Sequence, residues 1–312
     1  MIIALAGGVG GARLAHGLAR ILPPGELTVV VNTGDDFLLL GLHISPDPDT
    51  VMYTLSELAD PERGWGLKGE TFHAMEALAR LGGENWFALG DRDLATHIER
   101  TRRLKAGETL STITADFAAR LGITQHIVPM SDDPVRTIVH TDAGALPFQD
   151  YFVRRHCAPK VTRLEFAGAA AARPSPGLCA AMADQNLAGI IICPSNPFLS
   201  IDPILAIPGF RAWLQDRNVP CIAVSPLIGG KAVKGPAAKI MAELNLDATP
   251  CTIAEHYQGL IDGLLIDHAD SDQVFGPCHI TDTLMRGIAG RERLAREALT
   301  YIGTLRVAPR SK

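Results

Sequence analysis

Four aspartates follow one another closely in the stretch NTGDDFLLLGLHISPDPDT: Asp35, Asp36, Asp47 and Asp49. Proteins usually hold Mg²⁺ with one or two carboxylates together with the phosphates of a substrate. The structural alternative is that Asp49 caps a helix beginning at TVMYTL and that Asp47 belongs to a turn before Pro48. The stretch therefore predicts either a magnesium site or capping and turn chemistry.

A glycine-rich loop, AGGVGGAR, precedes these aspartates. Gly8, Gly10 and Gly11 allow a phosphate to approach the backbone at a helix N-terminus, and Arg13 would add a cation. The loop departs from the dinucleotide-binding fingerprint, because Arg13 occupies the third glycine position and Asn32 stands where an acidic residue would bind a ribose. A tight strand-to-helix turn without a ligand is the alternative.

Two later loops carry small polar groups, glycines and lysines. PSNPFLSIDPIL contains Ser195 and Asn196, and SPLIGGKAVKGPA contains Gly230, Lys231 and Lys234. Glycines followed by lysines at a helix start suit a second phosphate contact, although the spacing is not that of a P-loop. A surface turn with solvated lysines explains the same residues.

The stretch WFALGDRDLATHIERT places Asp91, Arg92, Asp93 and His97 around the start of a predicted helix. Asp91 or Asp93 caps that helix in the structural interpretation, and the group contributes to a site in the functional one. The sequence contains no nucleophile elbow, HExxH motif or CxxC pair, so covalent catalysis and zinc chemistry have no support.

Short apolar runs followed by polar or glycine-rich loops and then helical patterns predict an α/β protein with a mainly parallel sheet. Because ligands bind outside the carboxyl ends of such strands, the loops beginning at Gly7, Asn32, Pro194 and Ser225 are expected at one rim. The predicted sheet strands are 2–6, 27–32, 189–195 and 221–226, with further strands at 125–130, 136–141 and 161–166 and a helical tail at 281–305.

Helical periodicity replaces the strand pattern between about residues 51 and 121. We therefore expect a core formed by residues 1–50 and 122–312, and a smaller, mainly helical, lid-like insertion formed by residues 51–121. The insertion is expected to lie over the carboxyl edge of the sheet.

The composition is that of a globular enzyme: 312 residues, 47% hydrophobic and 20% charged. A net charge of −5 and only 5% aromatic residues argue against a nucleic-acid partner. The chain shows no signal peptide or membrane-spanning segment, so a cytoplasmic location is expected. Its six cysteines lack metal-site spacing and are expected to be reduced, buried thiols.

Taken together, several strings resemble the phospholactate transferases of deazaflavin coenzyme F-420 biosynthesis, in the same order and over nearly the whole chain. The strings are LAGGVGGARLAHGL, NTGDDFLLLGLHISPDPDTVMYTL, RGWGLKGETFHAM, WFALGDRDLATHIERT, PSNPFLSIDPILAIPG and SPLIGGKAVKGPA. LGDRDLATH combined with GDD and PDPDT is the most specific part of the resemblance.

The resemblance implies a Rossmann-like three-layer α/β/α core, Mg²⁺ as cofactor and a homodimer. It also implies transfer of a phospho-three-carbon-acid group from a guanosine diphosphate conjugate to the terminal ribityl hydroxyl of the deazaflavin Fo. GMP is released, and coenzyme F-420-0 or its dehydro form is the product. The acid is 2-phospholactate, enolpyruvyl phosphate or phosphoglycerate, and the sequence does not distinguish among them.

Carried onto this chain, the resemblance and the shared rim suggest the following roles. Asp36 and Asp49 would bind the metal, with Asp35 and Asp47 in reserve, and one carboxylate would accept the hydroxyl proton. The catalytic set would be Asp36, Asp49, Asp91 and Arg92. The substrate-binding set would be Gly8, Gly10, Gly11, Arg13, Asp35, Asp47, His97, Ser195, Asn196, Gly230, Lys231 and Lys234.

A related branch with a similar glycine loop resembles non-catalytic, sugar-nucleotide-binding regulators of carbon metabolism and cell-wall growth. In that branch the acidic pair leads into a stretch rich in glycine and serine. Here the pair leads into FLLLGLHISPDPDT, and LGDRDLATH follows. The sequence therefore favours the enzyme.

Overall fold

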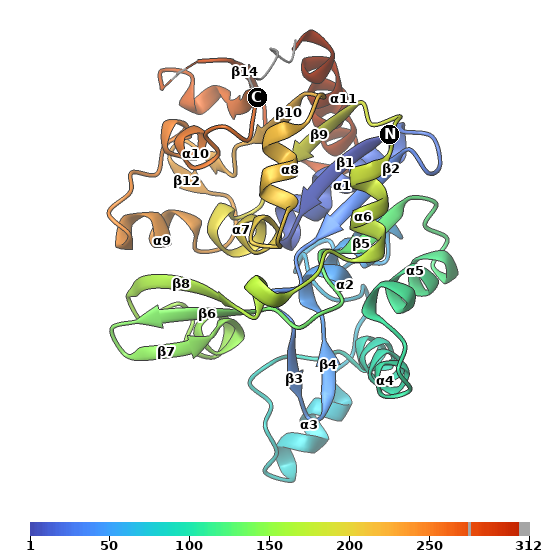
Figure 1. The fold of residues 1–312 in the computed structure, drawn as a ribbon. Helices are drawn as coiled ribbons and strands as arrows, with labels where there is room; N and C mark the ends of the chain where they lie inside the picture. Colours follow the sequence, from blue (N-terminus) through green and yellow to red (C-terminus); the bar gives the residue numbers. More distant parts are fainter. Residues whose placement is uncertain (274–275, 306–312) are drawn as a thin grey trace.

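The protein, described by a computed structural model over residues 1–273 and 276–305, is built around a seven-stranded parallel sheet (Figure 1). The strand order is β14, β13, β10, β9, β1, β2, β5, and each neighbouring pair is parallel. The bounds are β1 Ile2–Ala6, β2 Leu27–Val31, β5 His126–Pro129, β9 Gly189–Ile192, β10 Cys221–Val224, β13 Gly263–Asp267 and β14 Cys278–Thr281.

Helices cover both faces of this sheet. Alternate residues of β1 accordingly enter two different hydrophobic cores, one on each face. Ile3 and Leu5 belong to one core, and Ala4 and Ala6 belong to the other. The first core is completed by α6 Pro176–Ala183, α7 Asp202–Leu205, α8 Phe210–Asp216, α9 Ala237–Glu243 and α10 Pro250–His256. The second is completed by α1 Gly8–Ile21, α2 Pro46–Leu55, α5 Leu110–Arg120 and α11 Gly287–Thr304. This arrangement confirms the predicted α/β class and three layers.

The strands predicted at 2–6, 27–32, 125–130, 189–195 and 221–226 are all present in the main sheet, with ends differing by a few residues. The sequence analysis missed β13 and β14, which extend the sheet on one side. The strands predicted at 136–141 and 161–166 are also present, but they form a separate antiparallel sheet. It consists of β7 Gly144–Pro147, β6 Arg136–Thr141 and β8 Val161–Ala167.

The helices predicted between residues 51 and 121 are present: the greater part of α2, then α3 His73–Arg80, α4 Asp91–Lys105 and α5. Among them, α2 packs on α1 and α5 packs on β5, whereas α4 packs on the hairpin strand β4 and on α5. The hairpin, β3 Phe37–Leu39 with β4 Leu42–Ile44, was not predicted. With α3 it extends from the end of the core, as does the β6–β8 sheet (Figure 1). The predicted boundaries at residues 50 and 121 stay a prediction.

The remaining short elements are β11 Leu227–Ile228, β12 Lys231–Ala232, the π-helical turns Asp150–Arg154 and Pro197–Ile201, and the 3₁₀ turns Ala169–Ala171 and His268–Asp270. The six cysteines all lie in the described residues and form no disulfide there; Cys193 and Cys221 are buried, but Cys179 is exposed, contrary to expectation. Across the described ranges, none of the helices is long and apolar enough to span a bilayer.

Candidate functional site

A cavity of about 600 Å³ lies at the carboxyl ends of the sheet strands. Its wall includes residues from the loops that follow β1, β2, β9, β10 and β14, represented by Gly8, Asp35, Ser195, Ser225 and Thr283. The loops predicted to share one rim therefore do so. A volume of this size accommodates a cofactor-sized ligand.

Most of the predicted site residues line this cavity. They are Gly8, Gly10, Arg13, Asp35, Asp47, Asp49, His97, Ser195, Asn196 and Lys234. The others are not among the described residues of the cavity wall: Gly11, Asp36, Asp91, Arg92, Gly230 and Lys231. The packing and hydrogen bonds of these residues explain which of them lie in the cavity wall.

The first glycine loop combines close packing with an open helix N-terminus. A Cβ atom on Gly10 would lie 2.3 Å from the Pro194 carbonyl oxygen, and one on Gly11 would lie 2.3 Å from Ser195 Oγ. Gly8 has a φ of +62° and no atom near its missing Cβ, so its conformation and not its packing requires glycine. The glycines therefore bring α1 close to β9 and leave the start of α1 facing the cavity.

Asp47 occupies that helix N-terminus. Its Oδ1 accepts the Gly8 N–H at 2.7 Å, and its Oδ2 accepts a hydrogen bond from Asn32 Nδ2 at 3.0 Å. Burial, with Asp36 nearby, raises the pKa of Asp47 to about 6 despite these hydrogen bonds. Asp47 is thus a buried carboxylate at the cavity wall rather than a simple turn residue.

Asp35 and Asp36 each have an unsatisfied carboxylate oxygen. Asp35 lines the cavity; burial and the nearby Asp47 charge raise its pKa well above the usual range. Asp36 Oδ2 accepts a hydrogen bond from Ser45 Oγ at 2.7 Å and lies 3.0 Å from His43 Nε2. Asp35 Oδ1 and Asp36 Oδ1 are buried without a hydrogen-bond partner in the described chain. Unpaired carboxylate oxygens beside a cavity are a chemical fit for a divalent cation.

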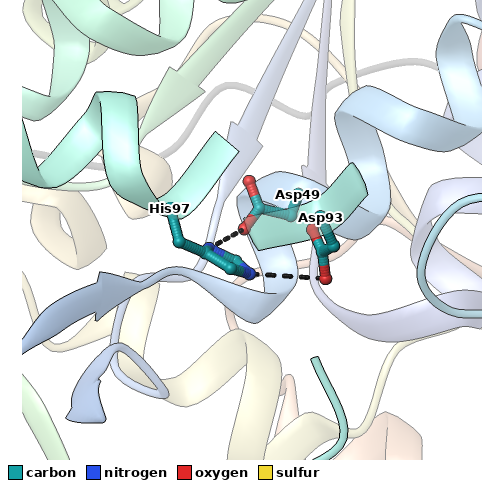
Figure 2. A group of neighbouring side chains, drawn as sticks. All are labelled: Asp49, Asp93 and His97. Atoms are coloured by element: carbon teal, nitrogen blue, oxygen red, sulfur yellow. Dashed lines mark ion pairs between the residues drawn. The ribbon is translucent and has the colours of Figure 1, made fainter. Parts of the chain in front are cut away.

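Asp49, predicted as a first-choice metal ligand, is held by a buried arginine. Both Asp49 oxygens accept hydrogen bonds from Arg100, Oδ2 from Nη1 at 3.0 Å and Oδ1 from Nη2. Asp49 also belongs, with Asp93 and His97, to a group whose potential ligand atoms lie within 4.8 Å of one another (Figure 2). Asp36 is not among the described residues of the cavity wall and Asp49 is neutralised by Arg100, so Asp35 and Asp47 are the two of the four aspartates that line the cavity without a cationic partner there; which aspartates bind a metal stays a prediction.

The prediction that Asp91 and Arg92 project toward a substrate is not supported by their positions. Asp91 accepts hydrogen bonds from Thr71 Oγ1 and from the N–H groups of His73 and Ala74 at 2.6 to 3.1 Å. Arg92 Nη1 donates to the Lys68 carbonyl oxygen at 3.2 Å. Asp91 therefore caps the N-terminus of α3 rather than that of its own helix, whose N-cap is Gly90 without a side-chain cap, so the predicted capping of α4 is wrong.

The second glycine loop is only partly a cavity element. The N–H groups of Gly229 and Gly230 donate to the Asp270 carboxylate at 3.0 and 2.9 Å, so an internal anion occupies the predicted phosphate contact. Both lysines are exposed, but only Lys234 is among the described residues of the cavity wall, with Arg13; it donates to the Arg63 carbonyl oxygen at 3.2 Å. Burial and the nearby Arg13 charge lower the pKa of Lys234. Of the two lysines, Lys234 is the one placed for an anion.

Ser195 and Asn196 shape the loop after β9. Ser195 Oγ accepts the Gly7 N–H at 3.1 Å, and Asn196 Oδ1 accepts the N–H groups of Phe198 and Leu199 at 3.0 and 3.2 Å. Asn196 Nδ2 is buried without a partner in the described chain. Both side chains line the cavity while they hold its wall in place.

Sequence reasoning missed the aromatic part of the wall. Trp65, Trp86, Phe87, Phe148 and Phe152 come from three separate segments and line one cavity. Phe148 stacks on Phe152 with ring centroids 5.3 Å apart. No periodic pattern joins these residues in the sequence, so only the fold brings them together.

A cation from the C-terminal helix was also missed. Arg291 of α11 lies with Nη1 3.3 Å from His16 Nδ1 of α1. Burial, with the nearby Arg13 charge, lowers the pKa of Arg291. Arg291 therefore lies against the middle of α1, and it is not among the described residues of the cavity wall.

The chain is similar to transferases of one family over most of its length. A model of the family "2-phospho-L-lactate transferase CofD" matches residues 2–276. The phosphoenolpyruvate transferase of Streptomyces coelicolor is 41% identical over 98% of this chain and 99% of its own. The 2-phospho-L-lactate transferase of Methanosarcina mazei is 39% identical over 94% of this chain and 98% of its own.

Among solved structures, a member of the UPF0052 family from Bacillus halodurans has a similar fold. The TM-score is 0.62, the identity is 13%, and the match covers 96% of this chain and 98% of that chain. At this identity the similarity concerns the fold alone.

Proposed function

Because this chain belongs to the 2-phospho-L-lactate transferase CofD family, we propose that it transfers a phospho-three-carbon-acid group to the deazaflavin Fo. The donor is a guanosine diphosphate conjugate of 2-phospholactate, enolpyruvyl phosphate or phosphoglycerate. The product is coenzyme F-420-0 or its dehydro form, and GMP is released. Relatives named for phosphoenolpyruvate and for 2-phospho-L-lactate are about equally similar, so the acid stays a set of alternatives.

The observation that carries the proposal is one cavity with two chemically different parts. Arg13, Lys234 and the start of α1 supply positive charge, and Asp35 and Asp47 supply carboxylates beside them. Trp86, Phe148 and other aromatic side chains form an apolar wall of the same cavity. A charged diphosphate and a flat tricyclic acceptor require this combination.

The positive part suits the diphosphate of the donor. The Gly8 N–H already donates to Asp47, so the next N–H groups at the start of α1 would bind phosphate oxygens, and the helix dipole would add to the attraction. Arg13 and Lys234 would neutralise the charge that develops on the departing GMP. Positioning and charge neutralisation are the main needs of such a transfer, since the protein forms no covalent intermediate.

Mg²⁺ is the proposed cofactor, and Asp35 and Asp47 would hold it. The unpaired Asp35 oxygen and the excess of buried carboxylates fit a divalent cation. When bound, the ion supplies positive charge to the non-bridging oxygens of the diphosphate.

In the proposed reaction, the terminal ribityl oxygen forms a bond to the phosphorus that carries the acid. The bond between that phosphorus and the GMP oxygen breaks, and GMP leaves with the electron pair. One cavity carboxylate accepts the hydroxyl proton. The aromatic wall orients the deazaflavin ring, so that the ribityl chain reaches the donor.

The test is to incubate the protein with Fo, Mg²⁺ and each guanosine-linked acid and to identify the deazaflavin product by mass. Conversion with one acid is expected, and the Asp35→Asn variant should lose most turnover while staying folded. Absence of conversion with all three acids, together with tight binding of a sugar nucleotide, would contradict the transferase function and support a sugar-nucleotide-binding regulator.

A further inference from the structure

Arg100 lies beneath the cavity wall and connects two helices. It is 2% exposed and belongs to α4, whereas its partner Asp49 belongs to α2. Its guanidinium contacts both oxygens of Asp49, and Nη1 also lies 3.3 Å from His97 Nδ1 and 3.4 Å from the His43 carbonyl oxygen. Arg100 itself is not one of the described residues of the cavity wall.

The contact with His97 determines where the imidazole carries its proton. An arginine has only donors and does not lose its proton in proteins, so a hydrogen bond at this contact has His97 Nδ1 as its acceptor, although Nδ1 also lies 3.7 Å from Asp49 Oδ2. The imidazole proton is then on Nε2. That atom lies within ion-pair distance of Asp93 Oδ2, at 3.3 Å, and has no hydrogen-bond partner in the described chain (Figure 2).

The donor and the acceptor of each neighbouring hydrogen bond can be assigned by the same argument. Tyr53 Oη lies 2.6 Å from Asp93 Oδ1 and 2.8 Å from Thr96 Oγ1. A tyrosine hydroxyl has one proton, and the carboxylate is the stronger acceptor, so Tyr53 donates to Asp93 and accepts from Thr96. Asp93 thus accepts a hydrogen bond from Tyr53 on one side and faces His97 Nε2 on the other.

This arrangement excludes two plausible roles for the Asp49, Asp93 and His97 group. A metal ion on these three residues would compete with the Arg100 guanidinium for Asp49 and lie close to its positive charge. His97 also cannot accept a proton at Nδ1, since Arg100 donates to that atom, or at Nε2, which already carries one. Yet Asp49, Tyr53, Asp93 and His97 all line the cavity.

We propose that Arg100 is a positioning residue that holds His97 in its Nε2–H form, so that His97 is a fixed hydrogen-bond donor in the cavity wall and not a general base. Through Asp49 and His97, Arg100 joins α2 to α4 and orients the carboxylate of Asp93. The proton acceptor of the transfer is then a carboxylate. Only the activity measurement below rests on the proposed function.

The decisive measurement is the ¹⁵N NMR spectrum of the histidine side chains in metal-free, full-length protein at neutral pH. His97 is assigned from the signals lost in His97→Gln. A protonated, pyrrole-type Nε2 and an unprotonated, pyridine-type Nδ1 are expected. A proton on Nδ1, with or without one on Nε2, would overturn the proposal.

The Arg100→Met variant tests whether Arg100 determines which nitrogen of His97 carries the proton. It retains an unbranched apolar side chain but has no donor, so the Nδ1 signal should lose its pyridine character, while His256, paired with Asp202 at 2.9 Å, should be unchanged. An unchanged His97 signal in folded Arg100→Met would show that Arg100 does not set the tautomer. If the variant does not fold because Asp49 is left buried and unpaired, the wild-type spectrum still decides whether His97 carries its proton on Nε2.

Activity provides a separate readout. Arg100→Lys keeps the charge but loses the planar fork, so kcat should fall by about 10- to 100-fold with little change in the KM of the guanosine conjugate. Unchanged kcat, or a loss confined to KM, would contradict a positioning role. Because the NMR measurement uses the protein alone, a wrong tautomer and an absence of transferase activity are distinguishable failures.

Discussion

At the scale of single residues, Asp47 illustrates how burial changes a carboxylate. Its pKa rises from an ordinary 3.8 to about 6, because burial disfavours the charged form. The folded state therefore binds a proton more tightly than the unfolded state between these two pH values. Stability associated with this proton is complete below the lower value and is lost as the pH rises through the higher one.

We predict that metal-free wild type gains stability relative to Asp47→Asn as the pH falls from 7 to 4. A shift of about two pKa units corresponds to about 3 kcal/mol. Urea unfolding of both proteins in the presence of a chelator measures the difference, and subtracting the variant removes the titrating groups that do not interact with Asp47. A difference that does not vary with pH would mean that Asp47 is not desolvated.

The two lysines of the second glycine loop provide a matched pair of variants. Both are exposed, but only Lys234 is among the described residues that line the cavity. Loss of a charged hydrogen bond costs about 1.5–3 kcal/mol, so Lys234→Met should raise the KM of the guanosine conjugate by about tenfold to a hundredfold. Lys231→Met should leave it nearly unchanged. Equal effects in steady-state kinetics would contradict the assignment.

At the scale of elements, the start of α1 depends on its glycines for close packing. Gly10 approaches the Pro194 backbone, which cannot move aside as a flexible side chain can, so Gly10→Ala should cost about 1–3 kcal/mol. At Gly303 in α11, an added Cβ would meet no atom within 4 Å, so Gly303→Ala should instead stabilise by up to about 1 kcal/mol. Denaturant midpoints of the two variants should therefore move in opposite directions. Equal midpoints would show that α1 tolerates the added methyl group.

At the scale of the whole molecule, the cavity joins segments that are far apart in the chain. Trp65 and Trp86 lie in its wall, whereas Trp213 packs on Phe210 and donates its indole N–H to the Met182 carbonyl oxygen. Two of the three tryptophans of the sequence therefore line the cavity, and Trp213, which is not in the cavity wall, serves as a fluorescence reference.

Binding of Fo should quench tryptophan emission, because its flat ring would lie against the aromatic wall. The quenching should persist in Trp213→Phe and be mostly lost in the double variant Trp65→Phe and Trp86→Phe. Titrations of the three proteins at equal concentration provide the comparison. Quenching that depends on Trp213 would place the acceptor elsewhere.

Much of the fold follows from local patterns. The apolar runs of β1, β2, β9 and β10 predicted a parallel sheet because strands buried on both faces lack alternation. The strand GLLID, residues 263–267, has the same character but was missed, since a run of this length is also compatible with a helix. The hairpin strands β3 and β4 are still shorter and were assigned to a loop.

The sequence by itself determined the rim: a glycine loop after the first strand and aspartates after the second must meet where parallel strands end. Only the tertiary structure decided what each residue does there. Arg100 reaches Asp49 across 51 positions of the chain, and Asp270 occupies the N–H groups of Gly229 and Gly230. The physical reason is that residue type and spacing set which elements form, whereas a carboxylate's charge and partners depend on neighbours that only packing brings near.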